Sequence, residues 1–390
     1  MSTARQRAAL VVAPAGPAAR PAEPAAGASS AEPAAGARSA LTASGARLGH
    51  GRVAVLDLGP LELESGARLA ALRVAYRHDG PGPDQGPQVL VIHALTGSAD
   101  AAGDWWQPLI GPGRALDTRR VGVLCANLLG GCYGTTGPTS IDPSTGRPYG
   151  DTFPAVTARD QARVQWALLD ALGTDRLALA TGGSLGGMVA LEVAAERPAA
   201  VAAIAPIAAP AATSGLALAW NAVQLELVDR YGADGLDLAR RLAMTTYRSE
   251  ADFDSRFGRA READGRFSVA SYLAHQGRKL VARFDPATYR VLVGAMDHHD
   301  LGHGRGGLDA ALGSLAAGGV RVTGIGIEGD ILHGPAQVRA LVAACHRAGV
   351  VARYREIATR KGHDAFLVEW EQLGRILEAA LVEATAEVTA

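Results

Sequence analysis

Apolar runs alternate with longer amphipathic segments from about residue 51 onward, and this alternation predicts the fold. Short, uniformly apolar and β-branched runs such as 89–92 are typical of buried parallel strands. A repeated strand-then-helix order predicts an α/β protein whose mostly parallel sheet has helices on both faces. Edge strands are expected at 53–58 and 72–77. Further strands are expected at 89–92, 121–125, 177–180, 201–207, 320–327 and 351–357, and helices at 157–172, 188–197, 335–347 and 364–384.

Two segments do not follow this alternation. Between 211 and 300, charged helical stretches at 216–229 and 236–244 occur with several aromatic side chains. We interpret 211–300 as a helical lid inserted into an α/β core formed by 48–210 and 301–390. Residues 1–47 are rich in Ala, Pro, Gly and Ser and contain no aromatic residue. Such a segment buries too little apolar surface to fold, so it is expected to be a disordered tail.

Composition excludes several classes of protein. The chain has 390 residues and a formal net charge of −1, which gives no electrostatic reason to bind nucleic acid or an anionic membrane. No apolar run approaches the roughly 20 residues that span a bilayer. The cysteines Cys125, Cys132 and Cys345 have no paired spacing. Neither a disulfide framework nor a metal site is therefore expected, and a cytoplasmic location is the simplest interpretation.

A nucleophile motif stands between an expected strand and an expected helix. Residues 181–188 read Thr-Gly-Gly-Ser-Leu-Gly-Gly-Met, which contains Gly-x-Ser-x-Gly in a strand–turn–helix context. Gly182 and Gly186 suit a sharp turn in which a side chain would clash. The turn would present Ser184 at the end of the sheet, beside a helix N-terminus that favours negative charge. The alternative is a Gly-rich turn with an incidental serine.

A serine hydroxyl needs a neighbouring base, and the base needs an acid that orients it. In α/β-hydrolase folds these residues follow the serine in the order acid, then histidine, each after a strand. His363 follows a clear strand and opens the last expected helix, and Asp330 ends the strand before it. Glu328 is the second choice for the acid. The alternative roles are a helix cap for Asp330 and a solvated helix end for His363.

The oxyanion of an acyl-transfer intermediate needs two preorganised donors. The backbone N–H of Leu185, directly after the nucleophile, is one candidate. The loop after 89–92 reads His93-Ala94-Leu95-Thr96-Gly97 and offers the N–H of Leu95 as the second. We interpret His93 as a structural residue of this loop rather than as a base.

Many further motifs occur in order along the chain. Examples are Asn-Leu-Leu-Gly-Gly-Cys at 127–132 and Gly-Arg-Pro-Tyr-Gly at 146–150. With these motifs the chain, from about residue 50 to 375, resembles the homoserine O-acetyltransferase family, α/β-hydrolase-fold acyltransferases of methionine biosynthesis. The resemblance also includes 93–97, 110–113, 134–138, 182–188, 246–249, 271–273, 276–277, 283–285 and 362–367.

The resemblance implies a ping-pong mechanism with acetyl-coenzyme A or another acyl-coenzyme A as co-substrate and no bound cofactor. Ser184 would attack the thioester, with His363 as base and Asp330 orienting it. The acyl group would then pass to the hydroxyl of an amino acid, most simply homoserine. Succinyl donors and serine acceptors are alternatives within the family. A serine hydrolase and a non-catalytic member are more remote ones.

The resemblance also implies binding residues for the amino-acid acceptor. Arg240 and the nearby Tyr247 in the lid match the pattern of a carboxylate-binding pair, and Asp364 would hold the amino group. An exposed helix charge is the alternative role of Arg240, and helix capping that of Asp364. The family further suggests a homodimer built through the lids. The lid after Ala219-Trp220-Asn221 is shorter than is usual in the family, which leaves that dimer and the pocket shapes open.

Overall fold

The computed structural model describes residues 51–386, so the tail predicted at 1–47 lies outside the described residues. Its main sheet has eight strands in the order β1-β2-β4-β3-β7-β8-β9-β10. β2 pairs antiparallel with β1 and β4, and every other neighbouring pair is parallel, which confirms the predicted sheet. The strands are β1 Val53–Glu62, β2 Arg68–Asp79, β3 Gln88–Ile92, β4 Gly122–Ala126, β7 Leu179–Gly183, β8 Ala203–Ile207, β9 Arg321–Ile327 and β10 Ala352–Ile357. A small second sheet contains β5 Ile141–Asp142 and β6 Arg147–Pro148.

The expectation of two edge strands at the start of the chain is wrong for 72–77. β1 lies at the edge of the sheet, but β2 lies between β1 and β4. The pairing with β4 covers the last four residues of β2, from Tyr76 to Asp79. Val74 and Tyr76 are accordingly fully buried.

Helices cover both faces of the sheet. The apolar side chains of α1 Ala158–Ala171, α2 Leu185–Glu196, α7 Leu308–Ala317 and α8 Pro335–Arg347 belong to one buried cluster. Those of α9 Trp370–Ala386 belong to a second cluster on the opposite face. Within residues 51–386, no helix combines the length and the apolar character needed to cross a membrane.

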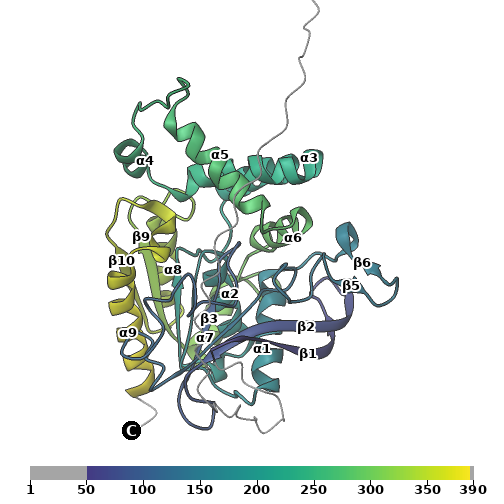
Figure 1. Cartoon of the computed structure of the whole chain (residues 1–390). Helices are drawn as coiled ribbons and strands as arrows, with labels where there is room; N and C mark the ends of the chain where they lie inside the picture. The colour runs from purple at the N-terminus through teal and green to yellow at the C-terminus, as the bar shows by residue number, and fades with distance from the viewer. Residues whose placement is uncertain (1–50, 387–390) are drawn as a thin grey trace, which may run out of the picture. The chain divides into compact units, whose positions relative to one another are not determined.

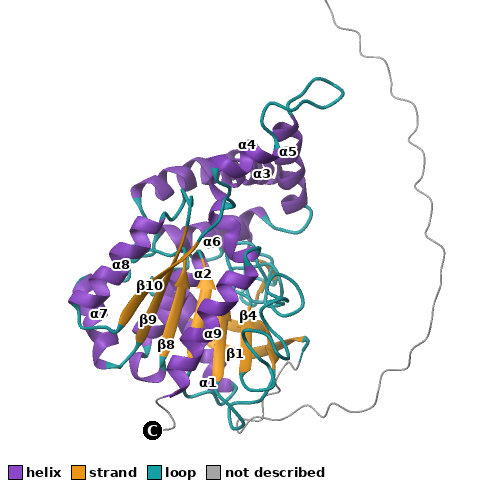
Figure 2. Ribbon diagram, turned by 90° about the vertical axis from the view of Figure 1, so that its left-hand side faces the viewer, coloured by secondary structure: helices purple, strands orange, loops and turns teal. Residues whose placement is uncertain are grey.

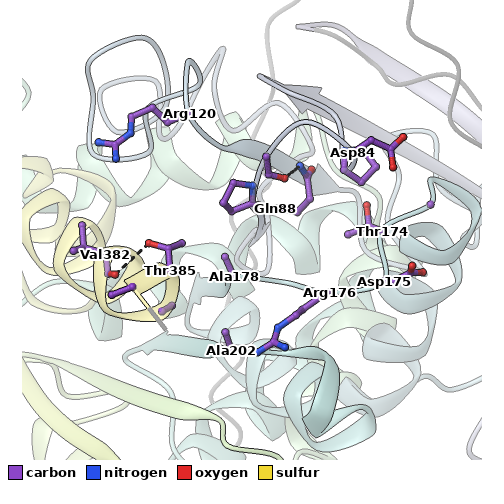
Figure 3. A pocket seen from close by; sticks show the side chains of 16 residues that line it. Asp84, Gln88, Arg120, Thr174, Asp175, Arg176, Ala178, Ala202, Val382 and Thr385 are labelled. Atoms are coloured by element: carbon purple, nitrogen blue, oxygen red, sulfur yellow. Dashed lines mark hydrogen bonds between the residues drawn. The ribbon is translucent and has the colours of Figure 1, made fainter. Parts of the chain in front are cut away.

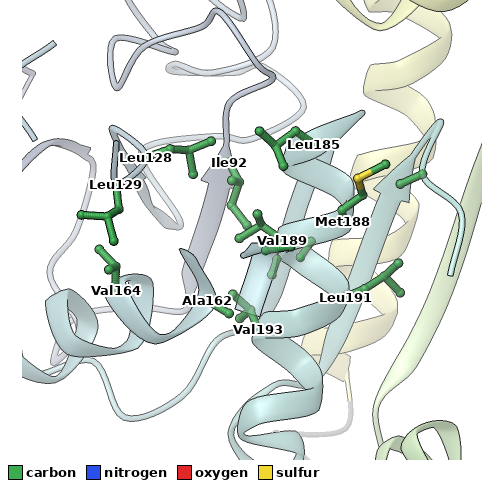
Figure 4. Close-up of a cluster of buried hydrophobic side chains, with 14 of the residues drawn as sticks. Ile92, Leu128, Leu129, Ala162, Val164, Leu185, Met188, Val189, Leu191 and Val193 are labelled. Atoms are coloured by element: carbon green, nitrogen blue, oxygen red, sulfur yellow. The ribbon is translucent and has the colours of Figure 1, made fainter. Parts of the chain in front are cut away.

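The α2 helix, which begins directly after Ser184, is packed on every side. Leu185, Met188, Val189, Leu191 and Val193 are fully buried. Figure 4 shows these side chains beside residues from β3, the loop after β4, and α1. Because interiors pack as densely as organic crystals, such a helix has a fixed position, and so has the turn that leads into it.

Four helices follow β8 and gather at one end of the sheet, in the segment that we interpret as a lid (Figures 1 and 2). They are α3 Gly215–Tyr247, α4 Glu250–Arg256, α5 Ser268–Val281 and α6 Pro286–Asp297. α3 joins the two expected helices across a kink at Gly232, whose φ of 57° and ψ of −122° are not helical.

The last helix begins later than predicted. Residues Gly362–Leu367 form a 3₁₀ turn, η3, and α9 starts only at Trp370. Val368 between them has a φ of −139°, which interrupts the helix. The turn places the ring of Phe366 against Gly183, where an added Cβ would lie 2.5 Å from the ring. Tertiary contact with the nucleophile turn therefore outweighs the helical pattern of 364–369.

Candidate active site

The nucleophile motif forms a strained turn between β7 and α2. Ser184 has a φ of 57° and a ψ of −124°, a backbone conformation that is costly for a residue other than glycine. Its N–H donates to the carbonyl of Ile207 in β8 at 2.9 Å. A Cβ at either Gly182 or Gly186 would clash with the carbonyl oxygen of Ile92. Close approach to β3 thus explains both glycines.

We expect Gly186→Ala to destabilise the fold by about 1–3 kcal/mol, because the new methyl group must displace the end of β3. Urea unfolding followed by circular dichroism measures the change. Gly294→Ala in α6 is the control, since nothing lies within 4 Å of the position its methyl group would take and alanine favours helix. Equal stability of the Gly186→Ala variant and the unaltered protein would contradict the packing described for this turn.

Asp330 and His363 form a buried hydrogen-bonded pair. Asp330 follows β9 and His363 lies in η3 after β10. The Nδ1 atom of His363 lies 2.7 Å from Oδ2 of Asp330, while Oδ1 accepts the N–H groups of Leu332 and His333 at 2.8 and 3.0 Å. This arrangement favours the tautomer with the proton on Nδ1 and leaves Nε2 as a base.

Asp330 and His363 each stabilise the charged form of the other. Burial acts to raise the pKa of Asp330, but His363, with a contribution from His333, opposes it and the net pKa is lowered. Burial acts to lower the pKa of His363, but Asp330, with a contribution from Asp364, opposes it and the net pKa is raised. Glu328, the second choice for the acid, is exposed and accepts the N–H of Thr359 at 3.0 Å instead. The geometry therefore pairs His363 with Asp330.

Ser184 and His363 lie at the same end of the sheet. Both are nearly buried, and Phe366, three residues after His363, packs on Gly183 directly before the serine. Among the described residues, the hydroxyl of Ser184 makes no hydrogen bond to the His363 ring. Catalytic hydrogen bonds of this kind are often long without substrate and tighten when it binds.

His93 has the structural role expected of it. Its Nδ1 atom lies 2.7 Å from the carbonyl oxygen of Ala94, and its Nε2 accepts the N–H of Leu128 at 3.0 Å. Burial lowers its pKa to about 4, so the ring is neutral at neutral pH. Both ring nitrogens are occupied in holding the loop after β3, which leaves neither for proton transfer.

Two backbone N–H groups, those of Leu95 and Leu185, are the candidates for an oxyanion hole. A turn closed by the N–H of Gly97 and the carbonyl of Ala94, at 2.9 Å, contains Leu95. Leu185 is the first residue of α2. Neither the N–H of Leu95 nor that of Leu185 donates to another of the described residues. Both donors are consequently available to a ligand.

Two of the three residues expected to bind an acceptor, Tyr247 and Asp364, lie next to His363, and the third, Arg240, lies over the Tyr247 ring. The ring centroid of Tyr247 lies 5.8 Å from that of His363, and the guanidinium carbon of Arg240 lies 5.2 Å from the Tyr247 ring centroid. Asp364 is adjacent to His363 in η3. Burial raises the pKa of Asp364, although Arg248 and Arg240 oppose this shift.

Arg248 is a residue of this site that the sequence reasoning missed. Its Nε lies 3.4 Å from Oδ2 of Asp364. The motif at 246–249 was part of the resemblance, but nothing in the sequence indicates that its arginine faces a carboxylate more than a hundred residues away.

A cavity of about 660 Å³ opens beside the candidate oxyanion loop. Its walls include residues of that loop, such as Thr96 and Gly97, and three cations of the lid, namely Arg240, Lys279 and Arg283. Arg283 fixes one wall, because its Nη1 donates to the carbonyl of Thr96 at 2.9 Å and to the hydroxyl of Tyr133 at 2.6 Å.

Comparison with known proteins decides the family. A family model described as alpha/beta hydrolase fold matches residues 87–292. A homoserine O-acetyltransferase from Moorella thermoacetica is 44% identical over 360 residues, which cover 85% of this chain and 96% of that protein. The chain belongs to the homoserine O-acetyltransferase family. This confirms the family and the acyltransferase class that the sequence motifs indicated.

Solved structures agree with membership of the homoserine O-acetyltransferase family. The crystal structure of homoserine O-acetyltransferase from Staphylococcus aureus has a TM-score of 0.71 and 30% identity, and the match covers 84% of this chain and 94% of that one. Esterase E22 has a TM-score of 0.78 at 22% identity, with 85% and 99% covered. The second likeness shows the fold alone, so the distinction between transfer and hydrolysis depends on the site.

A second cavity, of about 760 Å³, lies at the opposite end of the sheet (Figure 3). Gln88 begins β3, and Ala178 and Ala202 precede β7 and β8, so these lining residues mark the amino ends of the strands. None of the described residues that line it is a serine, cysteine or histidine. The cavity at the carboxyl ends of the strands, beside the loop that carries the candidate oxyanion donor Leu95, is therefore the candidate substrate site of this acyltransferase.

Proposed function

We propose that this chain transfers the acetyl group of acetyl-coenzyme A to the hydroxyl of L-homoserine. The observation that carries the proposal is the placement of Arg240 and Asp364, groups of opposite charge, around Tyr247 and His363. A zwitterionic amino acid presents one group of each sign, whereas the water used by a hydrolase requires neither. The names of the relatives support the same reaction.

In the first half-reaction, Ser184 attacks the thioester carbonyl of acetyl-coenzyme A and passes its proton to Nε2 of His363. Asp330 stabilises the imidazolium that forms. The N–H groups of Leu95 and Leu185 hold the negative charge on the carbonyl oxygen. When the carbon–sulfur bond breaks, the thiolate leaves with the proton from His363 and the acetyl group remains on Ser184.

In the second half-reaction, the homoserine hydroxyl attacks the acetyl-serine. Arg240 binds the carboxylate of the acceptor and Asp364 binds its ammonium group, so that the hydroxyl is directed at the ester carbon. His363 removes the hydroxyl proton and then returns a proton to Ser184 as the ester bond to the enzyme breaks. The cavity cations Lys279 and Arg283 supply charge complementary to the phosphates of coenzyme A.

A thiol-release assay tests this function. Acetyl- and succinyl-coenzyme A are each combined with homoserine, with serine and with no acceptor. We expect the fastest steady release of thiol with acetyl-coenzyme A and homoserine. Without an acceptor we expect a single burst of thiol, because the acetyl group then stays on Ser184 and blocks a second turnover. Equal steady release without an amino acid would show a hydrolase. A preference for a succinyl donor or a serine acceptor would overturn the specificity proposed.

We expect Asp364→Asn to raise the KM for homoserine by about 10- to 100-fold, because a buried charge-assisted hydrogen bond is lost. The burst of thiol without acceptor should persist, since acetylation of Ser184 does not use Asp364. Titration with homoserine and a rapid-mixing burst measurement separate the two effects. Asp309→Asn on the exposed side of α7 is the control with the same charge change. An unchanged KM would remove Asp364 from the acceptor site.

The predictions of a homodimer and of a cytoplasmic location belong to this proposal. Support for a dimer through the lid comes from large apolar side chains exposed along α3. These are Leu216, Leu218, Val223, Tyr231 and Leu238.

A further inference from the structure

Arg248 lies between two carboxylates in the corner where α3 leads into α4. Its Nε is 3.4 Å from Oδ2 of Asp364, and its Nη1 is 3.7 Å from Oδ2 of Asp252. Only 17% of the Arg248 side chain and 3% of the Asp252 side chain are exposed. The buried Nε has no hydrogen-bond partner among the described residues. The guanidinium is therefore shared between both acids and hydrogen-bonded through Nε to neither.

Asp252 also connects α4 to the loop that carries His363. Its Oδ1 lies 3.2 Å from Nζ of Lys361, two residues before the histidine. Its Oδ2 accepts from Arg256 at 3.4 Å. Asp252 thus lies near the three cations Arg248, Arg256 and Lys361, and Arg248 is the one that also faces Asp364.

The backbone of the same corner packs directly on this loop. The hydroxyl of Ser249 donates to the carbonyl of Arg360. Gly362 has a φ of 72°, and an added Cβ would lie 2.6 Å from the backbone nitrogen of Ser249. The α3–α4 corner is therefore in direct contact with the start of η3 and with Arg360 just before it.

We propose that Arg248 and Asp252 are positioning residues that keep Asp364 ionised and free to receive the ammonium group of the acceptor, an inference that rests on the proposed function. The cation beside Asp364 compensates for the burial of its carboxylate. Asp252 holds the guanidinium partly away, so that the Asp364 oxygens are not occupied by a close ion pair. The two residues have separable effects. Arg248 supplies the positive charge beside Asp364, and Asp252 limits how closely that guanidinium approaches the Asp364 carboxylate.

Several other charged or titratable groups face Asp364. Arg240 and Tyr247 come from α3, Asp330 from the loop after β9, and His363 is its neighbour in η3. Arg240 is assigned to the acceptor's carboxylate. Arg248 is therefore the cation whose removal leaves Asp364 without a permanent partner, so its loss is expected to raise the pKa of this carboxyl further.

The test compares Arg248→Gln, Arg248→Lys and Asp252→Asn with Asp254→Asn, an exposed carboxylate on the same helix. Homoserine KM and the acceptor-free thiol burst are measured across the neutral pH range. We expect Arg248→Gln to raise KM about tenfold, the lower end for a charge-assisted hydrogen bond. The increase should shrink as pH rises, because Asp364 then ionises without help. In Arg248→Lys the positive charge is kept, so the homoserine KM should depend on pH as it does in the unaltered protein.

Asp252→Asn is expected to raise KM by a similar factor at every pH, because the released guanidinium closes on Asp364 and competes with the acceptor. In all variants the burst should keep its size, and Asp254→Asn should match the unaltered protein. An unchanged KM in Arg248→Gln would overturn the inference. So would a rise in KM that comes with a smaller burst and a lower melting temperature, because the variant would then be damaged as a whole. Absence of homoserine-dependent release from the unaltered protein would instead overturn the proposed function itself.

Discussion

Replacing Ser184 by alanine is expected to lower the rate of thiol release by about 10⁴- to 10⁶-fold, because the hydroxyl that takes the acetyl group is removed. The strained backbone at 184 holds the hydroxyl beside the N-terminus of α2, and the methyl group of alanine cannot attack a thioester. The acceptor-free burst should vanish with the steady rate. Mass spectrometry of the protein mixed with acetyl-coenzyme A should find no acetyl adduct.

Ser314→Ala on the exposed side of α7 is the matched control, since it removes the same atom far from the nucleophile turn. It should retain both the burst and the adduct. An acetyl adduct that forms at the normal rate on the Ser184→Ala protein would place the nucleophile elsewhere and end the proposed mechanism.

The nucleophile turn could be predicted from sequence because its requirements are local. The motif and the strand and helix that flank it are contiguous in the chain, so its glycine spacing predicts the turn even though the clash that excludes side chains there comes from β3. The pairing of Asp330 with His363 could also be anticipated, because the carboxyl ends of parallel strands meet at one edge of the sheet. The sequence around Asp330 and Glu328 did not decide which of them is the acid that orients His363. The structure favours Asp330, which is bonded to His363, whereas Glu328 is bonded to the backbone of Thr359.

Features that depend on how the lid packs could not be predicted in this way. The 3₁₀ turn that replaces the start of the last helix exists because Phe366 packs against Gly183. The approach of Arg248 to Asp364 depends on the position of the α3–α4 corner over that turn. Neither contact has a periodic or motif signal, since the partners come from segments that meet only in the folded chain.

Asp330→Asn is expected to lower kcat by about 10⁴-fold, because an amide can donate to Nδ1 of His363 and favour the wrong tautomer. The pH profile should change as well. His363 must be neutral to accept a proton, so activity rises with pH through its pKa, which Asp330 holds above the ordinary value despite burial. Without the carboxylate this pKa falls, and the acidic limb of kcat/KM should move to lower pH.

Rate profiles for Asp330→Asn and Glu328→Gln, taken with saturating acetyl-coenzyme A, distinguish the two possible acids. Glu328 is exposed and bonds to the backbone of Thr359, so its loss should leave both the rate and the acidic limb as they are in the unaltered protein. The reverse result, in which Glu328→Gln is inactive and Asp330→Asn is not, would mean that a rearranged loop after β9 presents the other carboxylate to His363 during turnover.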